Sequence, residues 1–272
     1  MDITLFWISF IAYFTATLLH ILFLSLKSNR LSVGATVFMG LGFLMQTAAM
    51  IARTKISGHL PLTNMFEYVT VLAWFAGGAY LVSAWKLKLR ILEAVTGPVI
   101  FMLYVSASLL PKQAESQLMP ALQSVWLQIH VSLAAFGEAV FLVAFVASLL
   151  YLIKARTAPV VPGSFRDRLP SADTLDELTY RCVMIAYPLF TIGALFAGAV
   201  WAYKAWGNFW SWDPKETCSL IVWLVYSAYL HARLVKGWRG KKCAVLNIVG
   251  FVWTLFTLFS NLILGGLHAY GV

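Results

Sequence analysis

The feature that most constrains this chain is the spacing of its charged residues. Only 11% of the 272 residues are charged, whereas soluble domains carry roughly 25%. An uncharged apolar run of about 18 residues is long enough to cross a bilayer as a helix. Such runs cover residues 3–26, 31–52, 68–85, 94–111, 116–137, 182–203 and 243–272, with a shorter eighth at 217–232. The sequence therefore predicts an all-α fold, a polytopic transmembrane bundle of about eight helices.

The basic residues predict which way the bundle is threaded. With eight crossings, both termini lie on one side of the membrane. Fifteen of the twenty Lys and Arg residues fall in the connections after the first, third, fifth and seventh helices, and cytoplasmic loops are the ones enriched in basic residues. Both termini and the loops at 53–66, 111–125 and 204–213 are therefore expected on the outer, periplasmic or lumenal, side. This sidedness accounts for the net charge of +9, so nucleic acid is not expected as a partner.

The rest of the composition predicts a single integral membrane domain over residues 1–272. The long inner connection at 154–177 contains three prolines and mixed charges, which is typical of a loop. The three cysteines form no CxxC pair and fall in or beside apolar runs, so they are interpreted as small apolar residues. The first run has no basic segment before it, which favours a retained helix over a signal peptide.

A tryptophan-rich segment at 201–213 is predicted to lie at the outer surface. It has four tryptophans in twelve residues and ends at Asp213. Asp213, followed by Pro214 and by Glu216 at the third helical position, is a helix start signal, so the seventh helix is expected to begin at 214. Tryptophans also collect at bilayer interfaces, and such a belt is one interpretation. Four indoles around a glycine would also suit a large planar, partly polar ligand, because each offers a flat face and one N–H donor.

The predicted topology sorts the five histidines into two groups. His59, His130 and His268 are expected on the outer side. His20 and His231 each lie seventeen residues from the outer start of a helix, hence in the inner half of the bilayer, and His231 is expected to be a buried imidazole. A lone histidine in a helix is more often structural than a ligand, but two imidazoles on opposite sides of a plane form an axial pair for haem iron. No CxxCH motif is present, so a non-covalently carried haem is predicted.

Glu138 lies in the middle of the fifth helix, where a charged carboxylate costs about 2.5–3.5 kcal/mol. It is either a functional group or a neutral, hydrogen-bonded one. An ion or solute transporter would explain Glu138, and a membrane b-type cytochrome in quinol electron transfer would explain paired histidines. Neither alternative gives His130, His268 and the tryptophans a joint purpose.

Four stretches resemble one family. Residues 206–217, WGNFWSWDPKET, resemble the tryptophan-rich WWD signature of the haem-handling proteins of cytochrome c maturation, within an outer loop at about 201–216. The stretches 61–67, 126–132 and 266–271 resemble the early outer-loop motif and the two outer histidine segments of the CcsA (ResC) branch. The resemblance extends from about residue 58 to the C-terminus.

The resemblance implies a membrane protein that binds and translocates haem b and presents it at the outer face. There the two thiols of an apocytochrome c CxxCH motif would be joined to the haem vinyl groups. The chain would act with a CcsB (ResB)-like membrane subunit, as part of a cytochrome c synthase (haem lyase) complex. Its membrane would be the bacterial cytoplasmic membrane or the thylakoid membrane.

The resemblance also implies roles for particular residues. His130 and His268 would be the axial ligands of the outer haem, and His231 would be a ligand of an inner haem. The opposite inner ligand would come from the partner subunit, although the equal depth of His20 leaves a pairing within this chain open. His59 matches no ligand position. The other residues implied in haem binding are Trp206, Gly207, Trp210, Trp212 and Asp213. No nucleophile is indicated, so catalysis would rest on positioning of the haem.

Overall fold

The computed structural model describes residues 1–113, 117–157 and 159–268, without the side chains of residues 261 and 262. Throughout this described part the chain forms helices and connecting loops but no strand, which confirms the predicted all-α fold. The α-helices are α1 (Asp2–Leu26), α2 (Asn29–Ser57), α3 (Met65–Lys86), α4 (Arg90–Ser108), α5 (Val125–Lys154), α6 (Phe165–Arg168), α7 (Ala172–Phe190), α8 (Gly198–Trp206), α9 (Pro214–Leu234) and α10 (Lys241–Leu264). A 3-10 turn, η1 (Pro120–Leu122), precedes α5, and a π-helical segment, η2 (Thr191–Ala197), joins α7 to α8.

Seven helices of the described chain are long and apolar enough to cross a membrane. They are α1, α2, α3, α4, α5, the continuous helix from Ala172 to Trp206, and the segment Lys241–Ser260 of α10. The eighth expected crossing, α9, has 21 residues, but Lys215, Glu216 and Arg233 make it less apolar. A multi-pass membrane bundle is therefore confirmed. The side on which the termini lie stays a prediction.

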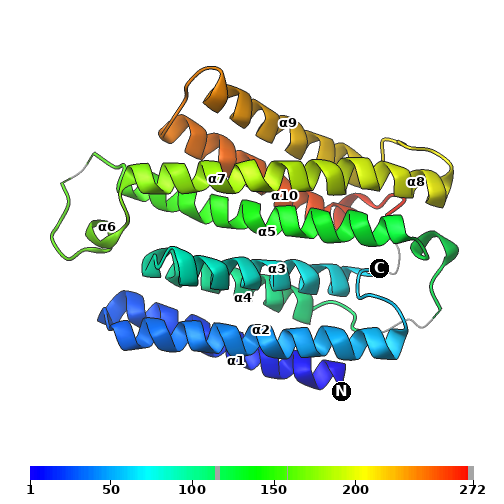
Figure 1. The fold of residues 1–272 in the computed structure, drawn as a ribbon, viewed down its shortest axis with the longest axis horizontal. Coiled ribbons are helices and arrows are strands. Elements are labelled where there is room, and N and C mark those ends of the chain that lie inside the picture. The colour runs from blue at the N-terminus through cyan, green and yellow to red at the C-terminus, as the bar shows by residue number, and fades with distance from the viewer. Residues whose placement is uncertain (114–116, 158, 269–272) are drawn as a thin grey trace. The chain divides into compact units, whose positions relative to one another are not determined.

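The helices group into two compact units, residues 1–118 and 119–272. In the first unit, drawn from blue to blue-green in Figure 1, α1 packs against α2 and α4, and α3 packs against α2 and α4. His20 lies in this core with no exposed surface. Its Nε2 is 2.9 Å from the Tyr80 hydroxyl, and Gly97 leaves room for its ring. His20 is thus enclosed by protein within its own unit.

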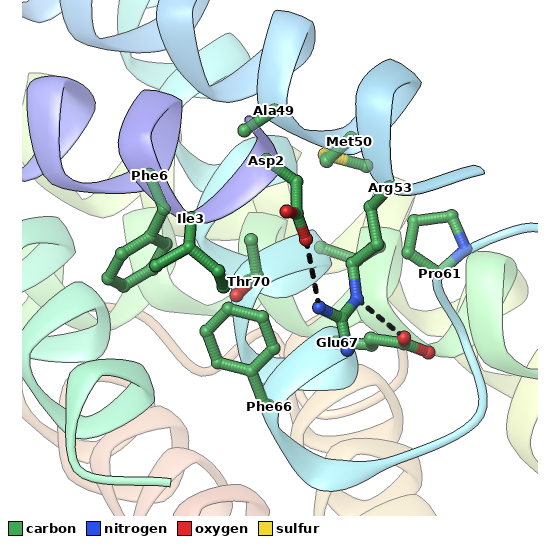
Figure 2. A pocket seen from close by; sticks show the side chains of 11 residues that line it. Asp2, Ile3, Phe6, Ala49, Met50, Arg53, Pro61, Phe66, Glu67 and Thr70 are labelled. Carbon is green, nitrogen blue, oxygen red and sulfur yellow. Dashed lines mark hydrogen bonds and ion pairs between the residues drawn. The ribbon is translucent and has the colours of Figure 1, made fainter. Parts of the chain in front are cut away.

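A buried ion pair lies at one end of the first unit. The Arg53 guanidinium donates to Glu67 (2.7 Å) and Asp2 (3.2 Å), and Figure 2 shows these groups beside a small, mainly apolar pocket. Arg53 also donates to the backbone oxygens of Lys112 and Gln113. The N-terminus, the loop after α2 and the segment after α4 therefore meet at one end, as expected of three segments on one side of the membrane.

The family-like stretch 61–67 builds this ion pair. The Asn64 side chain caps α3 by accepting from the Glu67 N–H (2.9 Å), as N-cap residues do. The Thr63 N–H and hydroxyl both donate to the second Glu67 oxygen (2.9 and 2.8 Å). Both oxygens of this buried carboxylate are thereby bound. The stretch holds Glu67 in position for Arg53, which is a structural role.

In the second unit, drawn from green to red in Figure 1, α5 packs against α7 and α10, and α9 packs against α10. Sixteen residues of α5 are buried, so it is the central helix of this unit. The three cysteines are free and buried, which confirms their interpretation as apolar residues. Arg233 at the end of α9 is buried against Asp176 of α7 (2.6 Å), which ties α9 to the α6–α7 side of the unit.

Candidate functional site

The expected start of the seventh helix is confirmed. The α9 helix begins at Pro214, with Asp213 as its N-cap and a complete capping box between Asp213 and Glu216. Glu216 also accepts from the Ser211 N–H (2.8 Å), so the cap fixes the end of the tryptophan-rich loop. Gly207, with a φ of 81°, ends α8 in the left-handed conformation, as glycine does at many helix ends. The loop 207–213 is thus held at both of its ends.

The structure brings His130 and His268 to the same indole. The His130 ring lies parallel to Trp201, at 8° and 5.9 Å between centroids, and the His268 ring lies 5.4 Å from Trp201. Trp206 completes the group, 4.9 Å from Trp201 and 5.0 Å from His268. These two histidines are far apart in the sequence. Their meeting at one end of one unit, with Asp213, defines the candidate site.

Trp201 is the residue that sequence reasoning missed. It is one of the four indoles of the tryptophan-rich segment, but it was not among the residues that the family resemblance implied in haem binding. It is 2% exposed, and its indole N–H donates to the Ala121 backbone oxygen (2.8 Å). Its contacts with both histidines place it at the centre of the candidate site.

Each histidine of the site is oriented through its Nδ1 atom. His130 Nδ1 donates to the Gly193 backbone oxygen (2.9 Å), which lies in the π-helical segment η2. His268 Nδ1 donates to Asp213 Oδ2 (2.8 Å). A carbonyl or an ionised carboxylate can only accept, so in both rings Nδ1 carries the proton. Any metal coordination by these two imidazoles would therefore use Nε2.

The Asp213 carboxylate is held by three donors. Besides His268, it accepts from the Lys215 N–H (3.0 Å) and the Leu267 N–H (2.5 Å). Burial acts to raise the pKa of Asp213, but the hydrogen bonds from His268, Lys215 and Leu267 outweigh burial and keep the pKa below its usual range. The carboxylate is therefore ionised at neutral pH.

Trp210 and Trp212 form a further aromatic pair in the loop. Their rings contact each other edge to face at 5.8 Å, and Trp212 is 70% exposed. The backbone of Trp212 has a φ of 57°, a conformation that costs a non-glycine residue about 1–3 kcal/mol and persists mainly at functional sites. These two indoles thus form a rim of the site in which Trp212 is exposed and Trp210 is half-buried.

His231 is not covered by other described residues of the chain. It lies in the last turn of α9 with its side chain exposed on the surface of the second unit. Its depth in the bilayer stays a prediction, and depth along the helix axis does not say which face of the helix a residue occupies. His59 lies in the loop after α2, with Nδ1 2.9 Å from the Leu60 backbone oxygen. Residues 269–271 of the C-terminal motif lie outside the described residues.

Glu138 is buried at 5% exposure in α5. Its carboxylate interacts electrostatically with Lys215, as Asp213 does. An opposite charge nearby lowers the cost of a carboxylate inside the bundle. The charge of Lys215 therefore accounts for a carboxylate at this position of α5.

Comparison with known proteins agrees with the geometry. The model of the family "Cytochrome C assembly protein" matches residues 62–268. A cytochrome c biogenesis protein CcsA from Chlamydomonas reinhardtii is 39% identical over 243 residues, covering 86% of this chain and 67% of that protein. The CcsA protein of Synechococcus elongatus is 37% identical over 284 residues, covering 87% and 86%.

A solved structure shares the fold. The cytochrome c haem lyase CcmF superposes with a TM-score of 0.71 over 95% of this chain, at 18% sequence identity. This chain spans 46% of that longer chain. The family match covers most of the chain, including both histidines of the site, and the two relatives are matched over 67% and 86% of their own length. The chain therefore belongs to the cytochrome c assembly family, with CcsA relatives, and its function lies in cytochrome c maturation.

Proposed function

We propose that the chain binds haem b non-covalently at its outer end and presents it there to apocytochrome c. His130 and His268 would be the axial ligands, and Trp201, Trp206, Trp210 and Trp212 would surround the haem. The observation that carries this proposal is the meeting of both histidines at Trp201. A belt of interfacial tryptophans would give no reason for two imidazoles to gather there.

The chemistry of the donor set fits haem. Two imidazoles, each with Nδ1 anchored to a protein acceptor, form the bis-histidine ligand set of many haem proteins. The surrounding indoles offer flat apolar faces and N–H donors. Among the described residues no group of three or more His, Cys, Asp or Glu side chains could hold a metal ion, so a bare metal centre has no support. The rim of Trp210 and Trp212 would leave one edge of the ligand open to a protein substrate.

In this mechanism the residues of the chain act by positioning. Bound haem would supply the vinyl groups to which the substrate thiols add. His130 and His268 would fix the iron, and the hydrogen bonds from Gly193 and Asp213 would fix the two rings. Trp201 and Trp206 would exclude water from the histidines. Holding reactants in the right geometry can account for a large share of a barrier, and no nucleophile of this chain is required.

We also propose an inner haem site shared with a CcsB (ResB)-like subunit, through His231. Its exposure on α9 suits a ligand completed by another chain. His20 is enclosed in its own unit by Tyr80 and Gly97, which supports the partner as the source of the second ligand. The same protein would then carry haem from the inner to the outer side of a bacterial or thylakoid membrane.

Replacing His231 by Ala is expected to deplete haem at the outer site, because the inner site would supply it. His20→Ala should lower the stability of the first unit but leave the haem content per folded chain unchanged, since His20 is a core residue. Haem per mole of folded complex, from the pyridine haemochrome spectrum, measures both. If His20→Ala by itself depletes haem as His231→Ala is expected to do, the two inner ligands lie within this chain. If neither variant loses haem, the inner site does not exist.

Replacing Trp210 or Trp212 by Phe is expected to weaken haem retention by about 2- to 10-fold, the range of a lost aromatic contact of 0.5–1.5 kcal/mol. The matched control is Trp85→Phe, because Trp85 is 72% exposed, like Trp212 at 70%, but lies in α3 of the other unit. Normal haem load and normal assembly in both loop variants would favour the aromatic-belt interpretation.

The decisive test of the proposed function is the haem content of the purified complex and of the chain alone. A pyridine haemochrome spectrum showing non-covalent haem b, together with maturation of a co-expressed cytochrome c, is the expected result. Absence of haem from both preparations would exclude the proposal and leave the transporter alternative.

A further inference from the structure

We infer that the two outer imidazoles are unequal ligands. His268 would stay bound to the iron because Asp213 supports it, and His130 would be the ligand that is exchanged. This inference rests on the proposed haem site. It makes Asp213 a positioning residue that acts on the haem through His268, in place of the direct haem contact implied by the family resemblance.

The group that accepts the hydrogen bond from His268 Nδ1 is a carboxylate with a full negative charge. Asp213 Oδ2 lies 2.8 Å from His268 Nδ1, and the Asp213 side chain is 1% exposed while that of His268 is 13% exposed. The same carboxylate accepts from the Leu267 N–H, so it binds both the backbone and the side chain of the segment that carries the ligand. His268 is thereby fixed in position and orientation by one ionised group.

The group that accepts the hydrogen bond from His130 Nδ1 is a neutral backbone carbonyl. His130 Nδ1 donates to the Gly193 oxygen at 2.9 Å, and that oxygen also accepts from the Gly198 N–H within the π-helical turn. Asp213 Oδ2 is shared in the same way, between His268 and the Lys215 N–H, so the two acceptors differ in charge and not in the number of donors. A neutral carbonyl polarises the Nδ1–H bond of His130 less than an ionised carboxylate polarises that of His268. It therefore leaves less electron density on the ring of His130.

This difference in acceptor has a known chemical effect. A carboxylate bound to the far nitrogen of a metal-ligating histidine raises the basicity of that ligand, and loss of such a partner typically costs about 10- to 100-fold in metal affinity. His268 should accordingly hold iron more tightly than His130. The more weakly held imidazole is then the one that an incoming substrate histidine can replace, one Fe–N coordinate bond breaking as another forms, with no electron or proton transferred.

The backbone before His268 is built for this contact. Gly266 has a φ of 111°, and a Cβ atom at this position would collide with Asp213 Oδ1. Only glycine allows the C-terminal segment to approach the carboxylate this closely. A structural N-cap alone would not require that approach, since the cap of α9 is complete with Lys215 and Glu216.

The test is a set of haem-dissociation rates from the purified, haem-loaded complex. His130→Gly leaves His268 as the outer ligand, and His268→Gly leaves His130. We expect haem to leave the His268→Gly complex about 10-fold faster or more than the His130→Gly complex. Asp213→Asn, which keeps a good N-cap residue, should speed dissociation about 10-fold in the His130→Gly background and have no effect in the His268→Gly background.

A vibrational measurement separates this role from capping. In the ferrous His130→Gly complex, Asp213→Asn should lower the iron–histidine stretching frequency in the resonance Raman spectrum. Glu216→Gln is the matched control, because it alters the same capping box without touching His268, and it should leave that frequency unchanged.

Two results would overturn the inference. Equal acceleration by Asp213→Asn in both backgrounds would make Asp213 a structural cap, and slower haem loss from His268→Gly than from His130→Gly would reverse the assignment. A wild-type complex without haem would instead refute the proposed function itself, so the two failures are distinguishable.

Discussion

Replacing His130 or His268 by Gly is expected to abolish cytochrome c maturation and to weaken haem retention by more than about 100-fold, since even the loss of a supporting partner of a ligand costs about 10- to 100-fold. Both rings lie against Trp201, so each variant removes one side of the same site. Maturation of a co-expressed cytochrome c and the haem content of the purified complex measure the effect.

Added imidazole should partly restore both properties, because it can fill the space left by either ring and coordinate iron in its place. His59→Gly is the control, since His59 Nδ1 bonds to the Leu60 backbone in the first unit, and it should mature cytochrome c normally. Wild-type maturation in both His130→Gly and His268→Gly would remove these residues from the site.

Replacing Arg53 by Ala is expected to destabilise the first unit by about 3–5 kcal/mol, the cost of leaving one member of a buried ion pair without its partner. The Glu67 side chain has 0% exposure and that of Arg53 4%, so the pair is shielded from solvent in the folded unit. The backbone oxygens of Lys112 and Gln113 would lose their donor as well. Unfolding of the purified protein in detergent, followed by helix content, measures the change.

The chain contains a matched control for this substitution. Arg181 pairs with Glu177 at 2.8 Å, but its side chain is 73% exposed. Arg181→Ala should therefore cost less than about 1 kcal/mol. Adding Glu67→Gln to Arg53→Ala should recover part of the lost stability, because the uncompensated buried charge is then removed. A similar small cost for Arg53→Ala and Arg181→Ala would show that the buried pair does not hold the unit together.

Local signals in the sequence predicted the helices well. The uncharged runs indicate the long helices, and the Asp213-Pro214 signal gives the start of α9 correctly. The sixth run, from residue 182, is a different case, since its helix begins at Ala172, where Ser171 caps it. The charges Asp176 and Glu177 are tolerated inside that helix because Arg233 and Arg181 pair with them. A run defined by absence of charge cannot include residues whose charges are neutralised by tertiary contacts.

The sequence allowed most residues of the candidate site to be predicted, but not the contacts between them. His130, His268, Trp206 and Asp213 were expected together at the outer end, and the structure groups them in one part of the second unit. The pairing of Asp213 with His268 had no sequence signal, because it joins residues 55 positions apart. The different surroundings of His20 and His231 also depend on which helix faces are covered, and periodicity is weak in helices that are apolar on all sides.

The π-helical segment η2 makes the spacing of residues as important as their identity. It lies between the part of the helix that packs against α5 and the part that carries Trp201 and Trp206, and Gly193 within it binds His130. A π turn holds one residue more than an α turn in the same helix. If the same residues were wound as a regular α-helix, the extra residue would rotate everything beyond it by about 100°. Both indoles would then turn away from the histidines, although no side chain of the site had been changed.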